Sequence, residues 1–139
     1  MKIIIFDDDP TGSQTVYGCP LLLSWDAKTL KKAFNQSSDL IFFLANTRSL
    51  SPHLAEKKIR EICLSLKDFF IKEKWSFQDY LFISRGDSTL RGHGFLEPQT
   101  LMDELGPFHA TFHIPAFLEG GRTTENRMHL LNGVPVHLT

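Results

Sequence analysis

The chain begins with a short apolar run that ends directly in three acidic residues, and this arrangement limits the folds that it can adopt. Residues 3–6 are Ile-Ile-Ile-Phe, and residues 7–9 are all Asp. A continuous apolar run of this kind is typical of a strand buried on both faces. Two like charges about 4 Å apart repel by roughly 4 kcal/mol at an effective dielectric constant near 20, so a proton, a cation, an arginine or a hydroxylated ligand must compensate them. Because Pro10 and Gly12 favour a defined turn, the acids are expected on a shaped loop at the end of a core strand.

The rest of the chain alternates between strand-like and helix-like segments. We expect strands over residues 2–6, 16–25, 40–45, 80–83 and 110–114, and helices over residues 27–35, 52–70 and 97–105. Asp26 and Ser51 are the expected N-caps of the first two helices, and Gly106 and Pro107 end the third. Alternation of this kind predicts an α/β fold with a mainly parallel sheet flanked by helices.

The end of the chain has the pattern of a β-hairpin. Asn132 and Gly133 lie between apolar segments over residues 128–131 and 134–138, and this dipeptide favours a two-residue hairpin turn. Because Pro135 cannot donate a hydrogen bond to a neighbouring strand, the second segment is expected at the edge of its sheet.

Four of the predicted strand ends or loops carry conspicuous polar groups. They are residues 7–9, residues 46–48, residues 84–87 and residues 120–122. Parallel α/β sheets bind ligands beyond the carboxyl ends of their strands. The four segments are therefore expected to contribute to a single site.

The segment over residues 84–93 has the composition of a binding loop. Arg85 and Arg91 flank Asp87 and the hydroxyl groups of Ser88 and Thr89. A guanidinium group suits a carboxylate or a phosphate, and the aspartate and hydroxyls suit sugar hydroxyls, so the mixture favours a small polyhydroxylated acid. In the alternative interpretation, internal ion pairs hold the loop together, with Arg85 or Arg91 neutralising the acids at residues 7–9.

The composition indicates a single cytoplasmic domain. The 139 residues are 42% hydrophobic with a net charge of -1, which is typical of a soluble globular chain and argues against a nucleic-acid partner. No apolar run is long enough to span a bilayer, and the amino terminus lacks the order of a signal peptide, so no membrane partner is expected. Cys19 and Cys63 have neither a disulfide framework nor zinc spacing, and no carboxylate neighbours His109 and His113, so no metal site is expected.

Three segments, in order along the chain, resemble the four-carbon acid sugar kinase family. They are Asp8-Asp9-Pro10-Thr11-Gly12, the run over residues 84–93, and Pro115-Ala116-Phe117 with Gly120-Gly121-Arg122. Residues 132–136 and the terminal Thr139 are similar to the stretch that follows this loop in the family. The core Asp-Ser-Thr-Leu-Arg-Gly within residues 84–93 is the most specific of these motifs.

The resemblance implies that residues 1–139 form one α/β domain, equivalent to the N-terminal, acid-binding half of a two-domain kinase. The ATP-binding half would lie outside this chain, in another domain or subunit, and would bind ATP and Mg²⁺. The implied reaction transfers the γ-phosphate of ATP to the terminal hydroxyl of a sugar acid of the threonate, erythronate or 3-oxo-tetronate type. Without the second half we expect binding and no turnover, and exposed apolar surface would favour a homo-oligomer.

The resemblance also assigns roles by position. Asp8 and Asp9 would be catalytic and would orient the hydroxyl groups, while Arg48 or Arg91 would bind the carboxylate. The residues expected to contact the substrate are Asp8, Asp9, Thr11, Arg48, Arg85, Asp87, Ser88, Arg91, His93, Gly121 and Arg122.

Two other functions fit parts of the sequence. Asp7, Asp9 and Thr11 match the D-x-D-x-T signature of haloacid-dehalogenase-like phosphatases, in which the first acid is the nucleophile, the second is a general acid and Mg²⁺ bridges them. The later lysine and paired-acid motifs of those enzymes are not evident. The third alternative is a non-catalytic module that binds a sugar acid.

Overall fold

A four-stranded parallel sheet forms the centre of the molecule. The computed structural model describes residues 1–139, apart from the side chain of Thr15. The strands are β1 (Ile3–Asp7), β2 (Leu21–Leu22), β3 (Leu40–Leu44) and β4 (Leu81–Arg85), and they lie in the order β2-β3-β1-β4. All neighbouring strands in this sheet are parallel. The predicted α/β class with a mainly parallel sheet is therefore confirmed.

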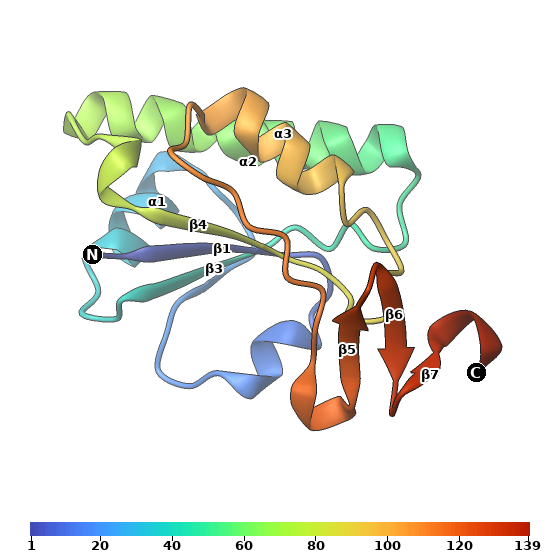
Figure 1. Ribbon diagram of the computed structural model, residues 1–139. Helices are drawn as coiled ribbons and strands as arrows, with labels where there is room; N and C mark the ends of the chain where they lie inside the picture. The colour runs from blue at the N-terminus through green and yellow to red at the C-terminus, as the bar shows by residue number, and fades with distance from the viewer.

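Three helices accompany the sheet. They are α1 (Ala27–Phe34), α2 (Pro52–Glu73) and α3 (Leu96–Leu105). Helices α2 and α3 lie side by side over one face of the sheet, while the connection from β1 to β2 runs on the other side (Figure 1). The Asp26 carboxylate caps α1 by accepting hydrogen bonds from the backbone N–H groups of Lys28 and Thr29, as its position in the sequence predicts. Ser51 occupies the N-cap of α2, but its side chain makes no capping hydrogen bond.

The core lies between the sheet and its helices. Phe6 and Phe43 on neighbouring strands are fully buried and stack with ring centroids 5.5 Å apart. Phe34 of α1 packs against Phe69 and Phe70 of α2, with centroids 5.3 and 5.6 Å away. Apolar residues at helical spacing along α2 form one buried face, which includes Ile59, Ile62 and Leu66.

A second, smaller sheet follows at the end of the chain. It contains β5 (Arg122–Glu125), β6 (Met128–Leu131) and β7 (Val134–Pro135), all antiparallel, in that order. Asn132 and Gly133 both have positive φ, as a primed two-residue turn requires, so the predicted hairpin is confirmed. The strand with Pro135 lies at an edge as predicted, but it is shorter, because residues 136–138 form a 3₁₀ helix. Strand β5 was not among the strands expected from the sequence.

The predicted strand over residues 110–114 is wrong. This segment has no strand pairing in the structure, and Phe112 and Ile114 are 82% and 78% exposed. The sequence pattern is compatible with a strand, but a strand also needs a partner, and no described residue of this segment pairs with the open edge of β4. His109 and His113 consequently do not share a strand face, and the ring of His113 stacks on Phe95 instead. The predicted strand over residues 16–25 is likewise reduced to Leu21–Leu22, because Gly18 and Pro20 interrupt it.

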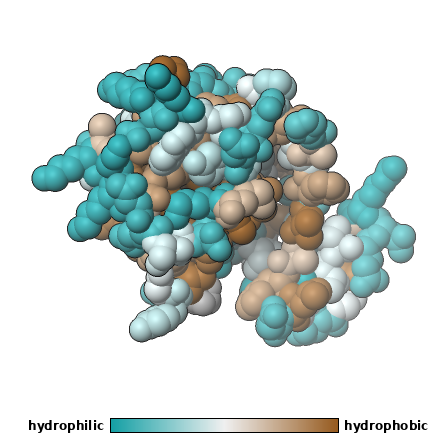
Figure 2. Space-filling view, turned by 90° about the vertical axis from the view of Figure 1, so that its left-hand side faces the viewer, coloured by the Kyte–Doolittle hydropathy of each residue, from teal (hydrophilic) through white to brown (hydrophobic). Residues whose placement is uncertain are grey.

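The exposed surface differs around the molecule. Figure 2 shows hydrophilic residues over much of the left-hand part of its view and hydrophobic residues gathered towards the right. The large hydrophobic side chains that are more than two-thirds exposed are Met1, Tyr17, Leu23, Ile71, Phe95, Phe112, Ile114, Leu118 and Leu138. None of the described helices has the length and apolar character needed to cross a membrane.

Candidate functional site

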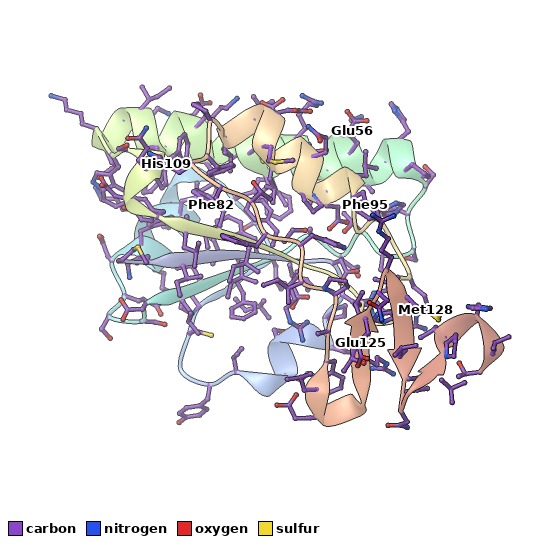
Figure 3. The ribbon with its side chains drawn as sticks, viewed as in Figure 1. Glu56, Phe82, Phe95, His109, Glu125 and Met128 are labelled. Atoms are coloured by element: carbon purple, nitrogen blue, oxygen red, sulfur yellow. The ribbon has the colours of Figure 1, made fainter. Side chains whose placement is uncertain are left out.

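The carboxyl ends of β1, β3 and β4 meet at one edge of the central sheet. In the strand register, Asp7 lies opposite both Leu44 and Arg85. The backbone N–H of Asp8 donates to the carbonyl of Arg85, and the N–H of Arg48 donates to the carbonyl of Asp8. These bonds hold three loops together beyond the strand ends, at the right-hand end of the sheet between the labels of Phe95 and Met128 (Figure 3).

Asp7 is buried beneath this edge and pairs with Arg85. Arg85 Nη1 donates to Asp7 Oδ1 at 3.2 Å, while Asp7 Oδ2 is buried with no hydrogen-bond partner. Burial raises the pKa of Asp7, against the opposing effect of the Arg85 guanidinium. Gly12 lies against the pair, because a Cβ atom there would overlap Arg85 Nη1 and both carboxylate oxygens of Asp7. The glycine in the predicted turn is therefore required by close packing.

Asp8 and Asp9 share Arg48. Arg48 donates through Nε and Nη2 to the two oxygens of Asp8, at 3.0 and 2.8 Å, and its Nη1 lies 3.3 Å from Asp9 Oδ2. The Asp8 side chain is almost completely buried, whereas that of Asp9 is 24% exposed. Asp9 also accepts hydrogen bonds from the hydroxyl and backbone N–H of Thr11, which hold the pKa of Asp9 below its ordinary value. Asp9 is therefore ionised at neutral pH and open to solvent.

Asp87 and Arg91 form a third pair on the loop after β4. Arg91 Nε donates to Asp87 Oδ2 at 2.6 Å, and the hydroxyl of Thr89 donates to the same oxygen. Burial alone would raise the pKa of Asp87, but these donors and the Arg91 charge outweigh it, so the pKa lies well below its ordinary value. Gly92, with φ +83°, brings the loop against the neighbouring strand ends, since a Cβ atom there would lie 3.3 Å from Arg48 Cγ and from Asp8 Oδ2.

These pairs act on one another electrostatically. Arg48 has a raised pKa, first because of its hydrogen bond with Asp8 and also because the carboxylates of Asp9 and Asp87 are near. Arg91 likewise has a raised pKa, first because of Asp87 and to a smaller extent because of Asp9. The acids at the end of β1 and Arg91 therefore lie on the same side of the molecule.

The small sheet reaches this site through Ser88. Arg122 Nη1 donates to Ser88 Oγ at 2.9 Å, and His129 Nε2 donates to the Ser88 carbonyl at 2.5 Å. Gly121 has φ +67° and lies against Asn132, so it is needed for the packing of the small sheet. Residues 120–122, the fourth segment expected at the site, are thus joined to the loop after β4. No strand of the central sheet leads into this segment.

His93 and Thr11, two further expected site residues, also have partners within the protein. His93 Nε2 donates to the carbonyl of Leu50 at 2.9 Å, which links the loop after β4 to the turn before α2. Thr11 is exposed, and its hydroxyl donates a hydrogen bond to Asp9 Oδ1.

Sequence reasoning missed a buried polar pair beneath the site. Thr47 Oγ1 donates to Glu97 Oε1 at 2.5 Å, and both residues are at least 98% buried. Burial raises the pKa of Glu97, with the neighbouring Asp8 charge acting in the same direction. Glu97 follows a glycine-containing loop at the start of a helix, where a glutamate is ordinarily exposed, so no sequence signal identifies it. His129, which is partly buried against Ser88, was not among the expected site residues.

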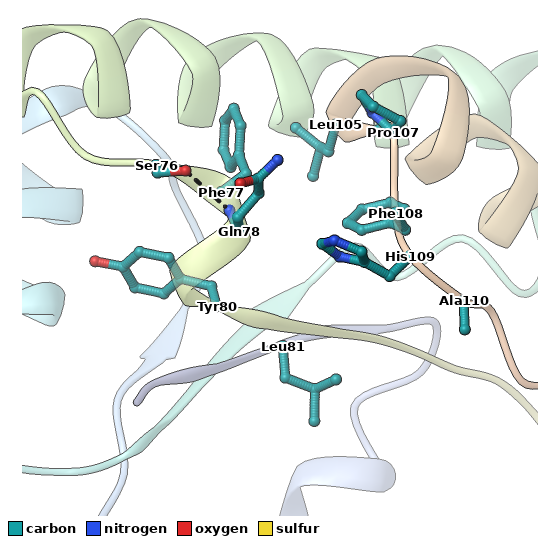
Figure 4. Close-up of a pocket in the computed structure, with 11 residues that line it drawn as sticks. Ser76, Phe77, Gln78, Tyr80, Leu81, Leu105, Pro107, Phe108, His109 and Ala110 are labelled. Carbon is teal, nitrogen blue, oxygen red and sulfur yellow. Dashed lines mark hydrogen bonds between the residues drawn. The ribbon is translucent and has the colours of Figure 1, made fainter.

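A depression in the surface lies away from the charged cluster. It has a volume of about 430 Å³ and is lined by Phe77, Tyr80, Leu81, Phe108 and His109, among others (Figure 4). These residues surround the amino end of β4, whereas the charged cluster lies at the carboxyl end. The depression therefore does not belong to the charged site.

The charged cluster does not have the composition of a metal site. Among the residues with described side chains, no three His, Cys, Asp or Glu groups are placed to hold one ion. Asp8 and Asp87 are already engaged by arginines, so the donor set does not fit Mg²⁺. Cys63 offers no nucleophile, since burial raises the pKa of its thiol to about 12.

Comparison with protein families identifies a match over almost the whole chain. Residues 3–139 match the family described as "Sugar-binding N-terminal domain". Comparison with curated proteins and with solved structures found no match.

Proposed function

Because this chain belongs to the family of sugar-binding N-terminal domains, the N-terminal domain of four-carbon acid sugar kinases, we propose that it binds the sugar acid in such a kinase. The proposed substrate is a four-carbon sugar acid of the threonate, erythronate or 3-oxo-tetronate type. The proposed reaction transfers the γ-phosphate of ATP to its terminal hydroxyl.

One observation carries this proposal beyond the family membership. Carboxylates and guanidinium groups from the ends of three adjacent strands converge at one edge of the sheet. A sugar acid needs acceptors for its hydroxyl groups and a cation for its carboxylate, and this edge supplies both. The depression at the other end of β4 is lined largely by aromatic and aliphatic groups and lacks such a set.

The two proposed catalytic acids have different roles. Asp9 is ionised and partly exposed, so it can accept a hydrogen bond from a substrate hydroxyl and orient it. Asp8 is buried in a bidentate pair with Arg48, so it is a positioning residue that holds the Arg48 guanidinium at this edge of the site. Phosphoryl transfer depends mainly on positioning and on neutralising spread negative charge, and this division of roles serves both.

We propose that ATP and Mg²⁺ are bound by a separate domain or subunit, because the charged cluster does not fit a magnesium site. The contribution of this chain is then to bind and orient the acid. We accordingly expect this domain by itself to bind the acid without consuming ATP.

The phosphatase alternative is disfavoured by the position of Asp7. A nucleophilic carboxylate must reach the phosphorus atom, but the Asp7 side chain is fully buried and paired with Arg85. The non-catalytic binding module differs from the proposed kinase half only in lacking an ATP-binding partner. It makes the same prediction for the isolated domain.

Isothermal titration calorimetry with threonate, erythronate and 3-oxo-tetronate tests the proposal. We expect at least one acid to bind, and Asp9→Asn to weaken it about 10-fold or more through loss of a charged hydrogen-bond acceptor. Asp79→Asn is the matched control, because this exposed acid lies beside the amino end of β4. Absence of binding for every acid, or equal affinities of the two variants, would contradict the proposed site.

A further inference from the structure

Four arginines lie in or beside the charged site, and three of them already have carboxylate partners. Arg48 holds Asp8 and Asp9, and the two other ion pairs join Arg85 to Asp7 and Arg91 to Asp87. The fourth is Arg122 at the start of β5. Among the described side chains, no carboxylate lies within ion-pair distance of it.

The surroundings of Arg122 engage one terminal nitrogen of its guanidinium and leave the buried Nε without a partner. Nη1 donates to Ser88 Oγ at 2.9 Å, and the group lies over the Phe117 ring, 5.7 Å from its centroid. Nε is buried and has no hydrogen-bond partner among the described side-chain and backbone atoms. An unpaired buried donor is unfavourable, so a site that retains one gains stability when an acceptor binds to it.

The pairing of charges decides which arginine can accept an anion. Three guanidinium groups already face four carboxylates at this edge. If Arg48 or Arg91 bound the carboxylate of a ligand, it would have to release an aspartate or share its charge with it. Breaking the largely buried Arg48–Asp8 pair leaves an uncompensated buried charge, and breaking the Arg91–Asp87 pair leaves Asp87 without its cation. Arg122 can bind an anion without breaking an ion pair.

We propose that Arg122 binds the carboxylate of the sugar acid, through Nε and the adjacent terminal nitrogen on the same edge. Arg48 binds the Asp8 carboxylate in this same way, through Nε and Nη2. The hydrogen bond to Ser88 ties the guanidinium to the loop that carries Asp87. The inference rests on the proposed function and replaces the expectation that Arg48 or Arg91 holds the carboxylate.

The proposal can be tested by NMR of the arginine Nε–H groups in the ¹⁵N-labelled domain. On addition of threonate or erythronate, whichever binds by calorimetry, we expect the Arg122 Nε–H resonance to move downfield and to exchange more slowly with water. The Arg91 Nε–H group serves as an internal reference, because it already donates to Asp87. Threitol, which has the same carbon chain without a carboxylate, should leave the Arg122 resonance in place.

Calorimetry of two variants supplies an independent readout. Arg122→Lys keeps the charge but loses the two-nitrogen edge, so we expect affinity for the acid to fall about 10- to 100-fold. Arg127→Lys, at an exposed position of the same small sheet, should bind as the unmodified domain does.

The outcomes separate this inference from the proposed function. If the unmodified domain binds no acid, the proposed function fails, and this inference fails with it. If the acid binds while the Arg122 resonance stays in place, or Arg122→Lys retains full affinity, this inference alone is overturned. Because the NMR experiment uses the unmodified domain, it remains decisive even if Arg122→Lys does not fold.

Discussion

Residues 3–105 and residues 106–139 are held in place by different forces. The first part contains every described hydrophobic side chain that is buried, from Ile4 to Leu105. The second part contains none, although it includes Phe112 and Ile114, and polar contacts with Ser88 join its small sheet to the loop after β4. A part anchored by burial is rigid, whereas a part anchored by a few hydrogen bonds opens at low free-energy cost. Arg122 is therefore held near the site by polar contacts with the loop after β4.

The largest expected effect concerns burial in the first part. Phe43→Ala should lower the free energy of unfolding by about 3–5 kcal/mol, because it removes a fully buried ring that stacks on Phe6. Leu130→Ala in β6, which is only partly buried, should cost about 1 kcal/mol or less. Urea unfolding followed by circular dichroism measures both. Equal losses would show that the small sheet is as firmly packed as the central one.

A smaller effect is expected where the first part forms the site. Gly12→Ala should cost about 1–3 kcal/mol and weaken acid binding, because the new methyl group would overlap the Asp7–Arg85 pair. Gly86→Ala is the control, since a Cβ atom there meets nothing within 4 Å. Thermal unfolding measures the loss of stability, and calorimetry measures the change in affinity for the acid. If Gly12→Ala were as well tolerated as the control, the close packing at this edge would not matter for the site.

The pH dependence of stability should distinguish two acids of the first part, the buried Glu97 and the partly buried Asp87. The raised pKa of Glu97 means that its stabilising contribution is complete below pH 4.5 and is lost as pH rises through the higher pKa of the folded state. Glu97→Gln keeps an acceptor for Thr47 and removes this loss. The free energy of unfolding of Glu97→Gln, relative to that of the unmodified domain, should therefore increase with pH. The increase is about 1.4 kcal/mol for each pH unit by which folding raises the pKa of Glu97.

Asp87 should behave in the opposite way. Its lowered pKa provides stability above pH 3.8 that is lost as pH falls towards the folded-state pKa. Asp87→Asn should therefore be less stable than the unmodified domain at neutral pH, with the difference shrinking in acid. Unfolding at a series of pH values measures both variants, and parallel profiles would refute the assigned pKa directions.

The smallest effect on global stability is expected in the second part. His129→Ala removes the hydrogen bond to the Ser88 carbonyl, so amide hydrogen exchange should accelerate over residues 122–135. The free energy of global unfolding should change by less than about 1 kcal/mol, because this bond contributes little to the core. His137→Ala, at an exposed position, is the control. If amides in the core of the first part exchanged faster by the same factor as those over residues 122–135, the two parts would form one cooperative unit.

Local signals in the sequence are enough to predict several elements. The apolar runs over residues 3–6 and 40–45 predict buried strands, and the helical spacing of apolar residues predicts the buried face of α2. Asp26 and the Asn132-Gly133 turn were identified because capping and turn geometry involve only neighbouring residues. The parallel arrangement follows from the alternation of these elements, and it brings the polar strand ends to one edge of the sheet.

The pairing of charges and the pairing of strands depend on the folded chain. Asp8 and Arg48 are 40 residues apart, and Thr47 and Glu97 are 50 apart, so no local pattern indicates that these side chains form pairs. Residues 110–114 have a strand-like sequence, yet a strand also requires hydrogen bonds to a neighbouring strand, which the sequence of one segment does not specify. The same reasoning applies to Arg122: its availability for a ligand depends on where every nearby carboxylate lies. Pairing energies depend on distance and burial, and both are properties of the folded chain.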